Sequence, residues 1–216
     1  MKILIYGNQA WIASHFSHYL KQQEIEYCYG YISIFNESNI TNEINHNFPT
    51  HVVVFLENNM NKLDHSDLFL PNTINPIIIH RICESKGIHF TLITTGMDCM
   101  YESKRNLERT ISEPPIFPYE TSQMINEQYF KNILSNSVCI FRLYMPYDYT
   151  QNKNNYLQYV IELGGKYSTF EHMYMSSIIQ LPHIVISHIK DKIGGFYAFR
   201  NRNKINPYQK IGRAHV

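Results

Sequence analysis

The sequence predicts an α/β protein built on a doubly wound parallel sheet. Short β-branched runs alternate with longer amphipathic stretches, which is typical of buried strands joined by crossover helices. The chain has 216 residues, of which 44% are hydrophobic and 17% charged. This length fits one compact domain, or one domain with a small appendage, and the apolar content excludes wholesale disorder.

The expected strands are five short apolar runs at residues 2–6, 26–29, 51–55, 88–93 and 138–143. Helical periodicity and length mark the segments between them, at residues 10–22, 37–46, 72–86 and 121–134. Because β–α–β crossovers are right-handed, these elements are expected to wind into one parallel sheet with helices on both faces.

The regular alternation stops after Pro146, and residues 148–155 form a polar, Asn-rich connection. We therefore expect residues 1–147 to form the sheet domain and residues 148–216 a smaller lobe. The pattern in that lobe predicts helices over 155–163 and 176–190 and a strand over 195–199.

Charge and cysteine content point to no particular partner. Lys and Arg total 19 and Asp and Glu 18, so the net charge of +1 is far from the basic balance of a nucleic-acid-binding protein. The four cysteines lack the close pairs of zinc sites and redox motifs, which favours a reduced compartment. The first apolar run is too short for a signal peptide or a membrane span. We expect a cytoplasmic protein that binds neither nucleic acid nor membranes.

The turn after the first strand is a candidate phosphate site, because the next helix directs its free amides and positive dipole end toward it. A full dinucleotide fingerprint has three glycines here. Only Gly7 is present, and alanine occupies the other two places, at Ala10 and Ala13. The methyl group of Ala10 would crowd a pyrophosphate. The pattern alone also fits an ordinary strand-to-helix turn.

A second candidate cluster combines Thr94 and Thr95, at the end of the fourth strand, with Tyr119 near the start of a helix. A hydroxyl and a tyrosine placed in this way can meet over the ligand crevice and pass a proton to a carbonyl group. A phenol has a pKa of about 10, so this role calls for a nearby cation. Gln123, one helical turn further on, is neutral. The alternative for Tyr119 is a packing role.

Three other groups have plain structural alternatives. His15 and His18 could present two imidazoles to a metal, but without a third ligand nearby we expect helix-surface residues and no metal site. The methionines at positions 97, 100, 173 and 175 could line a pocket or fill the core. The basic residues at positions 200, 202 and 204 could meet a nucleotide diphosphate or end a strand in solvent.

Several segments together resemble the extended short-chain dehydrogenase/reductase family. The similarity is to its nucleotide-sugar branch, the dTDP-4-dehydrorhamnose reductases and the UDP-4-keto-6-deoxy-glucose 3,5-epimerase/4-reductases. Residues 6–13 (YGNQAWIA) are similar to the motif YGxxGWIG, residues 49–52 (PTHV) to the start of the third strand, and residues 142–146 (RLYMP) to RxRMP. The resemblance covers most of the chain and implies a Rossmann-like NAD(P)-binding fold with a substrate lobe truncated soon after Pro207.

The resemblance also implies a function, the reduction of a 4-keto-6-deoxy nucleotide sugar with NAD or NADP. Tyr119 would donate the proton, Thr95 would be its hydroxyl partner, and Gln123 stands where the family has its catalytic lysine. The implied cofactor contacts are Gly7, Gln9, Trp11, Ile12, Asn72, Thr94, Met145 and Pro146.

The chain departs from the family around the expected cofactor. Gln123 removes the cation that lowers the pKa of the tyrosine. Residues 54–57 (VFLE) replace Asn-Ala-Ala-Gly, which places bulk and a carboxylate beside the cofactor path. The family has an arginine that binds the 2′-phosphate of NADP, and its position falls near Ser33 in this chain. The sequence therefore does not support a preference for NADP. The alternative function is a catalytically inactive Rossmann scaffold that binds a nucleotide sugar or a protein partner, and self-association is open.

Overall fold

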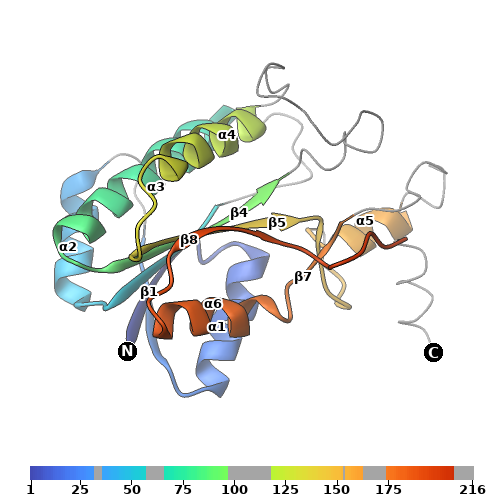
Figure 1. Ribbon diagram of the computed structural model, residues 1–216, viewed down its shortest axis with the longest axis horizontal. Coiled ribbons are helices and arrows are strands. Elements are labelled where there is room, and N and C mark those ends of the chain that lie inside the picture. Colours follow the sequence, from blue (N-terminus) through green and yellow to red (C-terminus); the bar gives the residue numbers. More distant parts are fainter. Residues whose placement is uncertain (32–35, 57–65, 97–117, 153, 163–173, 207–216) are drawn as a thin grey trace.

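The computed structural model of the chain has a central sheet of parallel strands in the order β2-β1-β3-β4-β5-β8 (Figure 1). It describes residues 1–31, 36–56, 66–96, 118–152, 154–162 and 174–206, except for the side chains of residues 66–68, 118–120 and 159. The sheet strands are β1 (Lys2–Tyr6), β2 (Glu26–Tyr29), β3 (His51–Phe55), β4 (His89–Gly96), β5 (Val138–Tyr144) and β8 (Gly195–Phe199). The predicted α/β fold with a parallel sheet is therefore confirmed.

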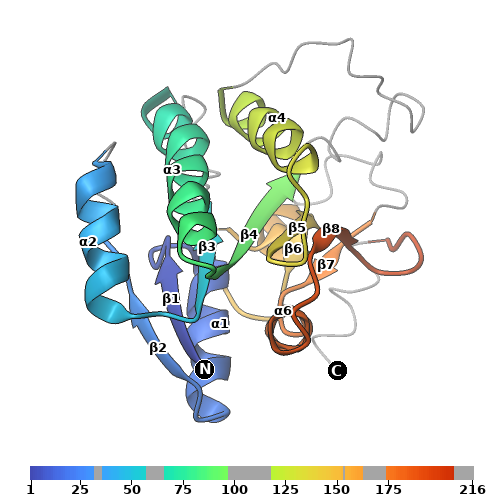
Figure 2. The same ribbon diagram turned by 60° about the vertical axis from the view of Figure 1, so that its left-hand side comes forward.

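Helices cover both faces of the sheet, as Figures 1 and 2 show. On one face lie α2 (Glu37–Asn47), α3 (Ser66–Ser85) and α4 (Pro118–Lys131). On the other lie α1 (Trp11–Gln22) and α6 (Leu181–Lys190), which pack against each other. Within the described ranges no helix combines the length and the apolar run needed to cross a bilayer.

Alternation along the strands divides the core into two layers. In β1, Ile3 and Ile5 join the apolar cluster under α1 and α6, whereas Leu4 and Tyr6 join the cluster under α2, α3 and α4. All four side chains are fully buried. A strand that is apolar on both faces reads as a continuous hydrophobic run, which is why the sequence identified it so directly.

The bounds of several elements differ from the predicted ones, and α4, for example, spans Pro118–Lys131 instead of residues 121–134. β4 continues through Gly96, because its last residues pair with β5 up to Tyr144. α3 begins at Ser66, six residues before the expected start, and contains both Pro71 and Pro76. The helix expected over 176–190 begins only at Leu181, with Pro182 in its first turn, where a missing amide hydrogen costs nothing.

The segment before α6 forms a small second sheet in which β6 (Pro146–Tyr147) pairs with β7 (Ser176–Ser177). The hydroxyl of Ser176 holds this segment in place, since it accepts from the amide of Tyr144 at 2.7 Å and donates to the carbonyl of Phe199. With α5 (Tyr156–Glu162), β6 and β7 surround a third, smaller apolar cluster. A helix through residue 176 is therefore wrong, because this hydroxyl ties the chain into an extended conformation.

The structure also corrects the position of the last strand. We expected residues 195–199 in the smaller lobe, but β8 is the sixth strand of the main sheet, where it pairs with β5 from Cys139 to Leu143. Its apolar residues continue the core, with Phe141 of β5 stacked against Tyr197 of β8 at a centroid distance of 5.5 Å. The division into domains 1–147 and 148–216 stays a prediction.

Candidate functional site

Only glycine fits the turn that joins β1 to α1. Gly7 has a φ of +79°, in the left-handed region, and a Cβ at this position would lie 2.0 Å from the carbonyl oxygen of Phe55. The turn therefore runs directly against the end of β3. The amide of Ala10 donates to the carbonyl of Gly7 at 3.0 Å, which closes the turn immediately before α1.

No side chain of the N-cap residue caps the N-terminus of α1. Ala10 is the N-cap residue and offers no side-chain acceptor, and the first turn holds no acidic residue. The first amides of a helix have no intrahelical acceptor, so this end suits an anion. Gln9 is exposed here, Trp11 is buried and Ile12 is half-buried. Trp11 and Ile12 can thus offer their backbone amides to a ligand, as the resemblance implies.

The side chains of Ala10 and Phe55, which we expected to crowd the cofactor, pack into the core, and their effect on a cofactor stays a prediction. The methyl group of Ala10 packs against the apolar cluster under α1 and α6. The ring of Phe55 lies in the same cluster, 5.5 Å from the ring of Phe16, and Leu56 is buried as well. Glu57 lies outside the described residues, so the expected carboxylate beside the cofactor path stays a prediction.

The carboxyl end of β4 meets α4 at Thr94 and Gln123. The hydroxyl of Thr94 donates to Oε1 of Gln123, and both side chains are buried, at 1% and 5% exposure. Nε2 of Gln123 is also buried and has no hydrogen-bond partner within the described part of the chain. A buried donor without an acceptor is costly, so this amide suits an acceptor supplied by a ligand. The structure thus brings together two of the predicted site residues.

Thr95 and Tyr119 were predicted to work as a pair. Thr95 is the penultimate residue of β4 and is buried. Tyr119 is the second residue of α4, four positions before Gln123, so both belong to one face of the helix. The side chain of Tyr119 lies outside the described part, and its pairing with Thr95 stays a prediction.

A bidentate ion pair lies next to this cluster, between Arg142 of β5 and Glu127 of α4. Nε and Nη2 of Arg142 each donate to one carboxylate oxygen of Glu127 at 2.5 Å. Burial alone would lower the pKa of Arg142, but the Glu127 carboxylate outweighs it and raises the pKa above its ordinary value. The charge of Arg142 is thus already matched by a carboxylate.

Sequence reasoning found Arg142 through the RxRMP-like segment but missed Glu127. The available signal was its spacing, because Glu127 lies one helical turn after Gln123 and so shares its face of α4.

Three other predicted cofactor contacts lie on elements around the same edge of the sheet. Asn72 is buried in α3. Met145 links β5 to β6 with a φ of +40° and packs its side chain into the smaller apolar cluster, and Pro146 is half-buried. Their contacts with a cofactor stay predictions.

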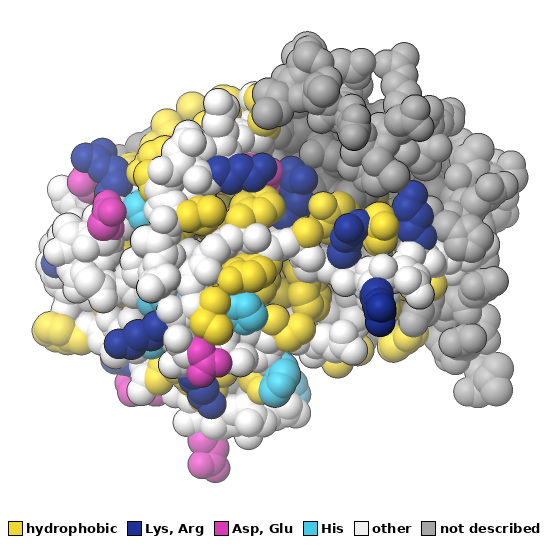
Figure 3. All heavy atoms as spheres, in the orientation of Figure 1, with side chains coloured by type: hydrophobic (Ala, Val, Ile, Leu, Met, Phe, Trp, Pro, Cys, Tyr) yellow, Lys and Arg dark blue, Asp and Glu magenta, His cyan; other side chains and the backbone are white. Residues whose placement is uncertain are grey.

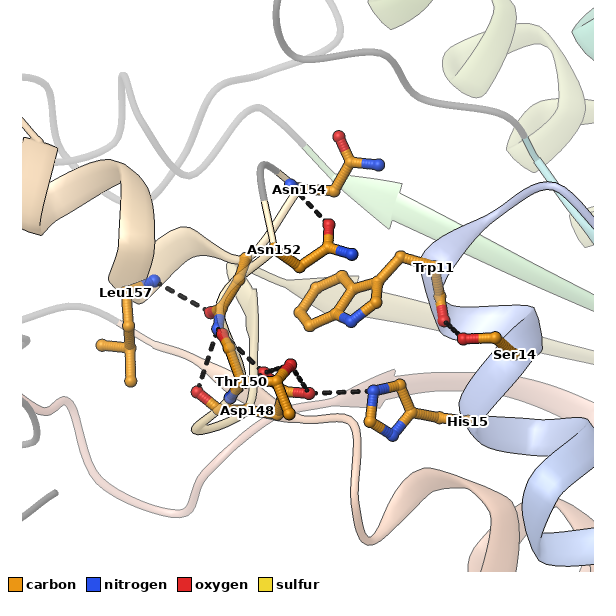
Figure 4. A network of polar contacts seen from close by, with 9 residues as sticks. Trp11, Ser14, His15, Asp148, Thr150, Asn152, Asn154 and Leu157 are labelled. Atoms are coloured by element: carbon orange, nitrogen blue, oxygen red, sulfur yellow. Dashed lines mark hydrogen bonds and ion pairs between the residues drawn. The ribbon is translucent and has the colours of Figure 1, made fainter.

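His15 was expected on the helix surface, and the structure corrects this. Its Nε2 lies 2.8 Å from Oδ2 of Asp148, a side chain with 1% exposure (Figure 4). Asp148 also accepts from the hydroxyl of Thr150 at 2.7 Å and from Nδ2 of Asn155 at 2.8 Å. Trp11 packs edge-on to the imidazole at 5.8 Å. The network ties the first turns of α1 to the connection after β6, and no local sequence pattern could have revealed it.

The remaining candidates have simpler outcomes. His18 is exposed and contacts Gln22 at 3.0 Å, and the described residues contain no group of three metal-ligating side chains. Met175 is fully buried in the smaller apolar cluster, so it fills a core. Ser33 and the methionines at positions 97, 100 and 173 lie outside the described residues.

Comparisons with known proteins agree on the fold. No protein-family model matches the chain. The uncharacterized protein L780 of Acanthamoeba polyphaga mimivirus is 24% identical over 220 residues, which cover 93% of this chain and 74% of L780. The crystal structure of the L780 UDP-rhamnose synthase superposes with a TM-score of 0.73 at 21% identity, covering 98% of this chain and 79% of that one.

Two further solved structures are dTDP-4-dehydrorhamnose reductases. The enzyme from Clostridium acetobutylicum gives a TM-score of 0.74 at 19% identity, and the one from Bacillus anthracis, in complex with NADP, gives 0.74 at 18%. Each alignment covers 99% of this chain and 79% of the other. The chain therefore has a Rossmann-like fold.

Proposed function

We propose that the chain is an NAD(P)-dependent, nucleotide-sugar reductase-like protein of the extended short-chain dehydrogenase/reductase type. Its reaction would be the reduction of a 4-keto-6-deoxy nucleotide sugar, as in rhamnose synthesis. The observation that carries the proposal is the Gly7 turn, packed against Phe55 and followed by an uncapped helix. The likeness to the L780 UDP-rhamnose synthase and to two dTDP-4-dehydrorhamnose reductases supports this choice of substrate.

Two features of the described residues fit a dinucleotide. The turn at Gly7 packs directly against the carbonyl of Phe55 and leads into the uncapped N-terminus of α1, where the amides of Trp11 and Ile12 can donate to a pyrophosphate. Among the described residues the buried Nε2 of Gln123 has no acceptor, and a ribose hydroxyl would supply one. The nicotinamide, when bound, would supply the hydride.

The proton would come from Tyr119, with Thr95 as its hydroxyl partner. Neutral Gln123 provides no charge to lower the pKa of the phenol, and the nearby cation of Arg142 is bound to Glu127. We therefore infer that proton transfer is slow. The whole site would work in the cytoplasm on a soluble nucleotide sugar.

The second candidate is a scaffold of the same fold that binds a nucleotide sugar, or a protein, without turnover. The contact of Gln123 with Thr94 favours this function, because it satisfies part of a buried amide without providing a charge. Binding would then survive while the chemistry is lost.

The test is incubation of the purified protein with NADH or NADPH and the UDP- and dTDP-linked 4-keto-6-deoxy sugars. Mass spectrometry should find the reduced sugar, and deuterium at C4 of the nicotinamide should transfer to it. Tyr119→Phe is the matched control and should give no product. If a dinucleotide and a nucleotide sugar both bind but the sugar is not reduced, the scaffold function holds instead. If the folded protein binds neither a dinucleotide nor a nucleotide sugar, the proposal fails.

A further inference from the structure

Three basic side chains follow the last sheet strand without an acidic partner. Arg200, Arg202 and Lys204 are exposed, and the surrounding sequence, residues 193–206, contains no aspartate or glutamate. Within the described ranges none of the three forms an ion pair. Figure 3 shows lysine and arginine side chains gathered around hydrophobic ones on this part of the surface. The cluster is a local excess of positive charge in a chain whose net charge is only +1.

Two tyrosines order this cluster. The guanidinium carbon of Arg200 lies 3.6 Å from the ring centroid of Tyr174 and 5.6 Å from that of Tyr144. Nζ of Lys204 lies 5.5 Å from the centroid of Tyr174. A guanidinium stacked on a ring keeps its in-plane N–H donors free. Arg200 thus presents an ordered fork of donors, for which the described residues supply no acceptor.

The backbone on both sides of this stack is fixed by hydrogen bonds. The amide of Asn201, next to Arg200, donates to the carbonyl of Met175, next to Tyr174, at 2.8 Å. The hydroxyl of Ser176 accepts from the amide of Tyr144 and donates to the carbonyl of Phe199. Because the strands carrying these residues are already joined, little ordering is needed when a ligand binds.

The cluster lies at the edge of the sheet where ligands bind in doubly wound folds. Tyr144 is the last residue of β5, and Arg200 directly follows β8, the neighbouring parallel strand. Both residues are therefore at the carboxyl ends of their strands, the same edge as Thr94 and Gly7.

We propose that Arg200 and Lys204, ordered on Tyr174, bind the diphosphate of a nucleoside diphosphate. The guanidinium fork donates to two phosphate oxygens, and the ammonium of Lys204 adds a second positive charge. Arg202, which stacks on no ring within the described residues, adds a third positive charge to the cluster. The identification of this ligand as the nucleotide end of the sugar substrate rests on the proposed function above, whereas the anion site itself depends only on these residues.

The experiment is a calorimetric titration of the full chain with UDP, dTDP, uridine and inorganic pyrophosphate. The variant is Arg200→Ala/Lys204→Ala, and the control is Lys21→Ala/Lys190→Ala, which removes two exposed charges from the ends of α1 and α6. We expect UDP or dTDP to bind the native protein and to lose about tenfold or more in affinity in the variant, because charge-assisted hydrogen bonds are lost. The control should stay within about twofold of the native affinity. Uridine, which has no phosphate, should show the same affinity for the native protein, the variant and the control.

NADH is titrated into the same three proteins to separate this proposal from the proposed function. Unchanged NADH affinity together with weaker UDP binding supports the diphosphate site. Nucleoside diphosphate binding that is equal in variant and native protein overturns the site and leaves the proposed function standing. The site is also overturned if the native protein binds NADH but no nucleoside diphosphate. If the double variant does not fold, Arg200→Lys, which keeps the charge but removes the fork, must weaken UDP binding by about threefold or more, or the proposal is wrong.

Discussion

The side chain of Asn126 in α4 donates from Nδ2 to the backbone carbonyl of Asn72 in α3, at 2.5 Å. In an uninterrupted helix this carbonyl would accept from the amide four residues later, but that residue is Pro76, which has no amide hydrogen. Asn126 thus supplies the missing donor from the neighbouring helix. Because Asn126 lies three residues after Gln123, the bond links α3 to the face of α4 that carries the candidate site.

Asn126→Leu should lower the free energy of unfolding by about 1–3 kcal/mol, because it removes a buried hydrogen bond that joins α4 to α3. Chemical denaturation measures the change. The exposed Gln128→Leu is the control on the same helix and should stay within about 0.5 kcal/mol. Pro76→Ala restores an amide to Asn72, so Asn126→Leu should cost less in that background. Equal costs in both backgrounds would contradict the role given to Asn126.

The strands were predictable because their signal is local. β1, β2, β3 and β8 have the bounds that the apolar runs predicted, since each strand is a short run between turn residues. The start of α3 was not predictable from its prolines. A proline in a helix normally marks a break, and Pro71 stands between the observed start at Ser66 and the predicted start at residue 72.

The candidate site was predictable only where one segment carries it. Gly7 was identified because its turn directly follows a strand, and Thr94 because it lies near the carboxyl end of one. The pairs of Glu127 with Arg142 and of His15 with Asp148 join residues from different elements. Such contacts depend on tertiary packing, which no spacing in the sequence encodes. The same reason explains why β8 was assigned to the wrong part of the fold.

Gly7→Ala should destabilise the protein far more than Gly87→Ala. Both glycines have a positive φ, +79° and +66°, so alanine is strained at either position. At Gly87 nothing lies within 4 Å of the added Cβ, and the cost should be about 1–2 kcal/mol. At Gly7 the contact with the carbonyl of Phe55 should add at least about 1–3 kcal/mol. Urea unfolding of the two variants compares them, and equal midpoints would show that the turn does not pack against β3.

Acid should destabilise the fold through His51 and His89, which are paired on the neighbouring strands β3 and β4 with ring centroids 5.6 Å apart. Burial, aided by His89, lowers the pKa of His51 to about 4, and burial lowers the pKa of His89. Unfolded histidine has a pKa of about 6.5, so the unfolded chain binds more protons between these values. The stability contributed by neutral His51 is complete above pH 6.5 and is lost as the pH falls toward 4.

His89→Gln should reduce the loss of stability between pH 7.5 and pH 5, measured as the shift in denaturation midpoint. His18→Gln, which changes an exposed residue of α1, is the control and should keep the native pH dependence. If His89→Gln loses as much stability between pH 7.5 and pH 5 as the native protein, other groups cause the acid destabilisation.

Gln123→Lys should raise any trace of ketone reduction. The ammonium would lie one helical turn from Tyr119, where its charge lowers the pKa of the phenol and favours proton transfer at neutral pH. A shift of one unit corresponds to about 1.4 kcal/mol, which is enough to change the rate measurably. Tyr119→Phe in the same background should abolish the gain, and neutral Gln123→Met should produce none. A lysine variant that folds, binds NADH and stays inert would place the defect elsewhere, first at residues 55–57.

Titration of NADH and NADPH into the purified chain tests the central claim, that this fold still binds a dinucleotide at the Gly7 turn. We predict weak binding of both, with affinities within about tenfold of each other, because the resemblance implies that Ser33 stands near the position of an arginine that binds the 2′-phosphate in short-chain dehydrogenases. Gly87→Ala should preserve this binding, and Gly7→Ala, where it folds, should abolish it. Folded native protein that binds neither cofactor would contradict the claim, and tight binding with a large preference for NADPH would contradict the role given to Ser33.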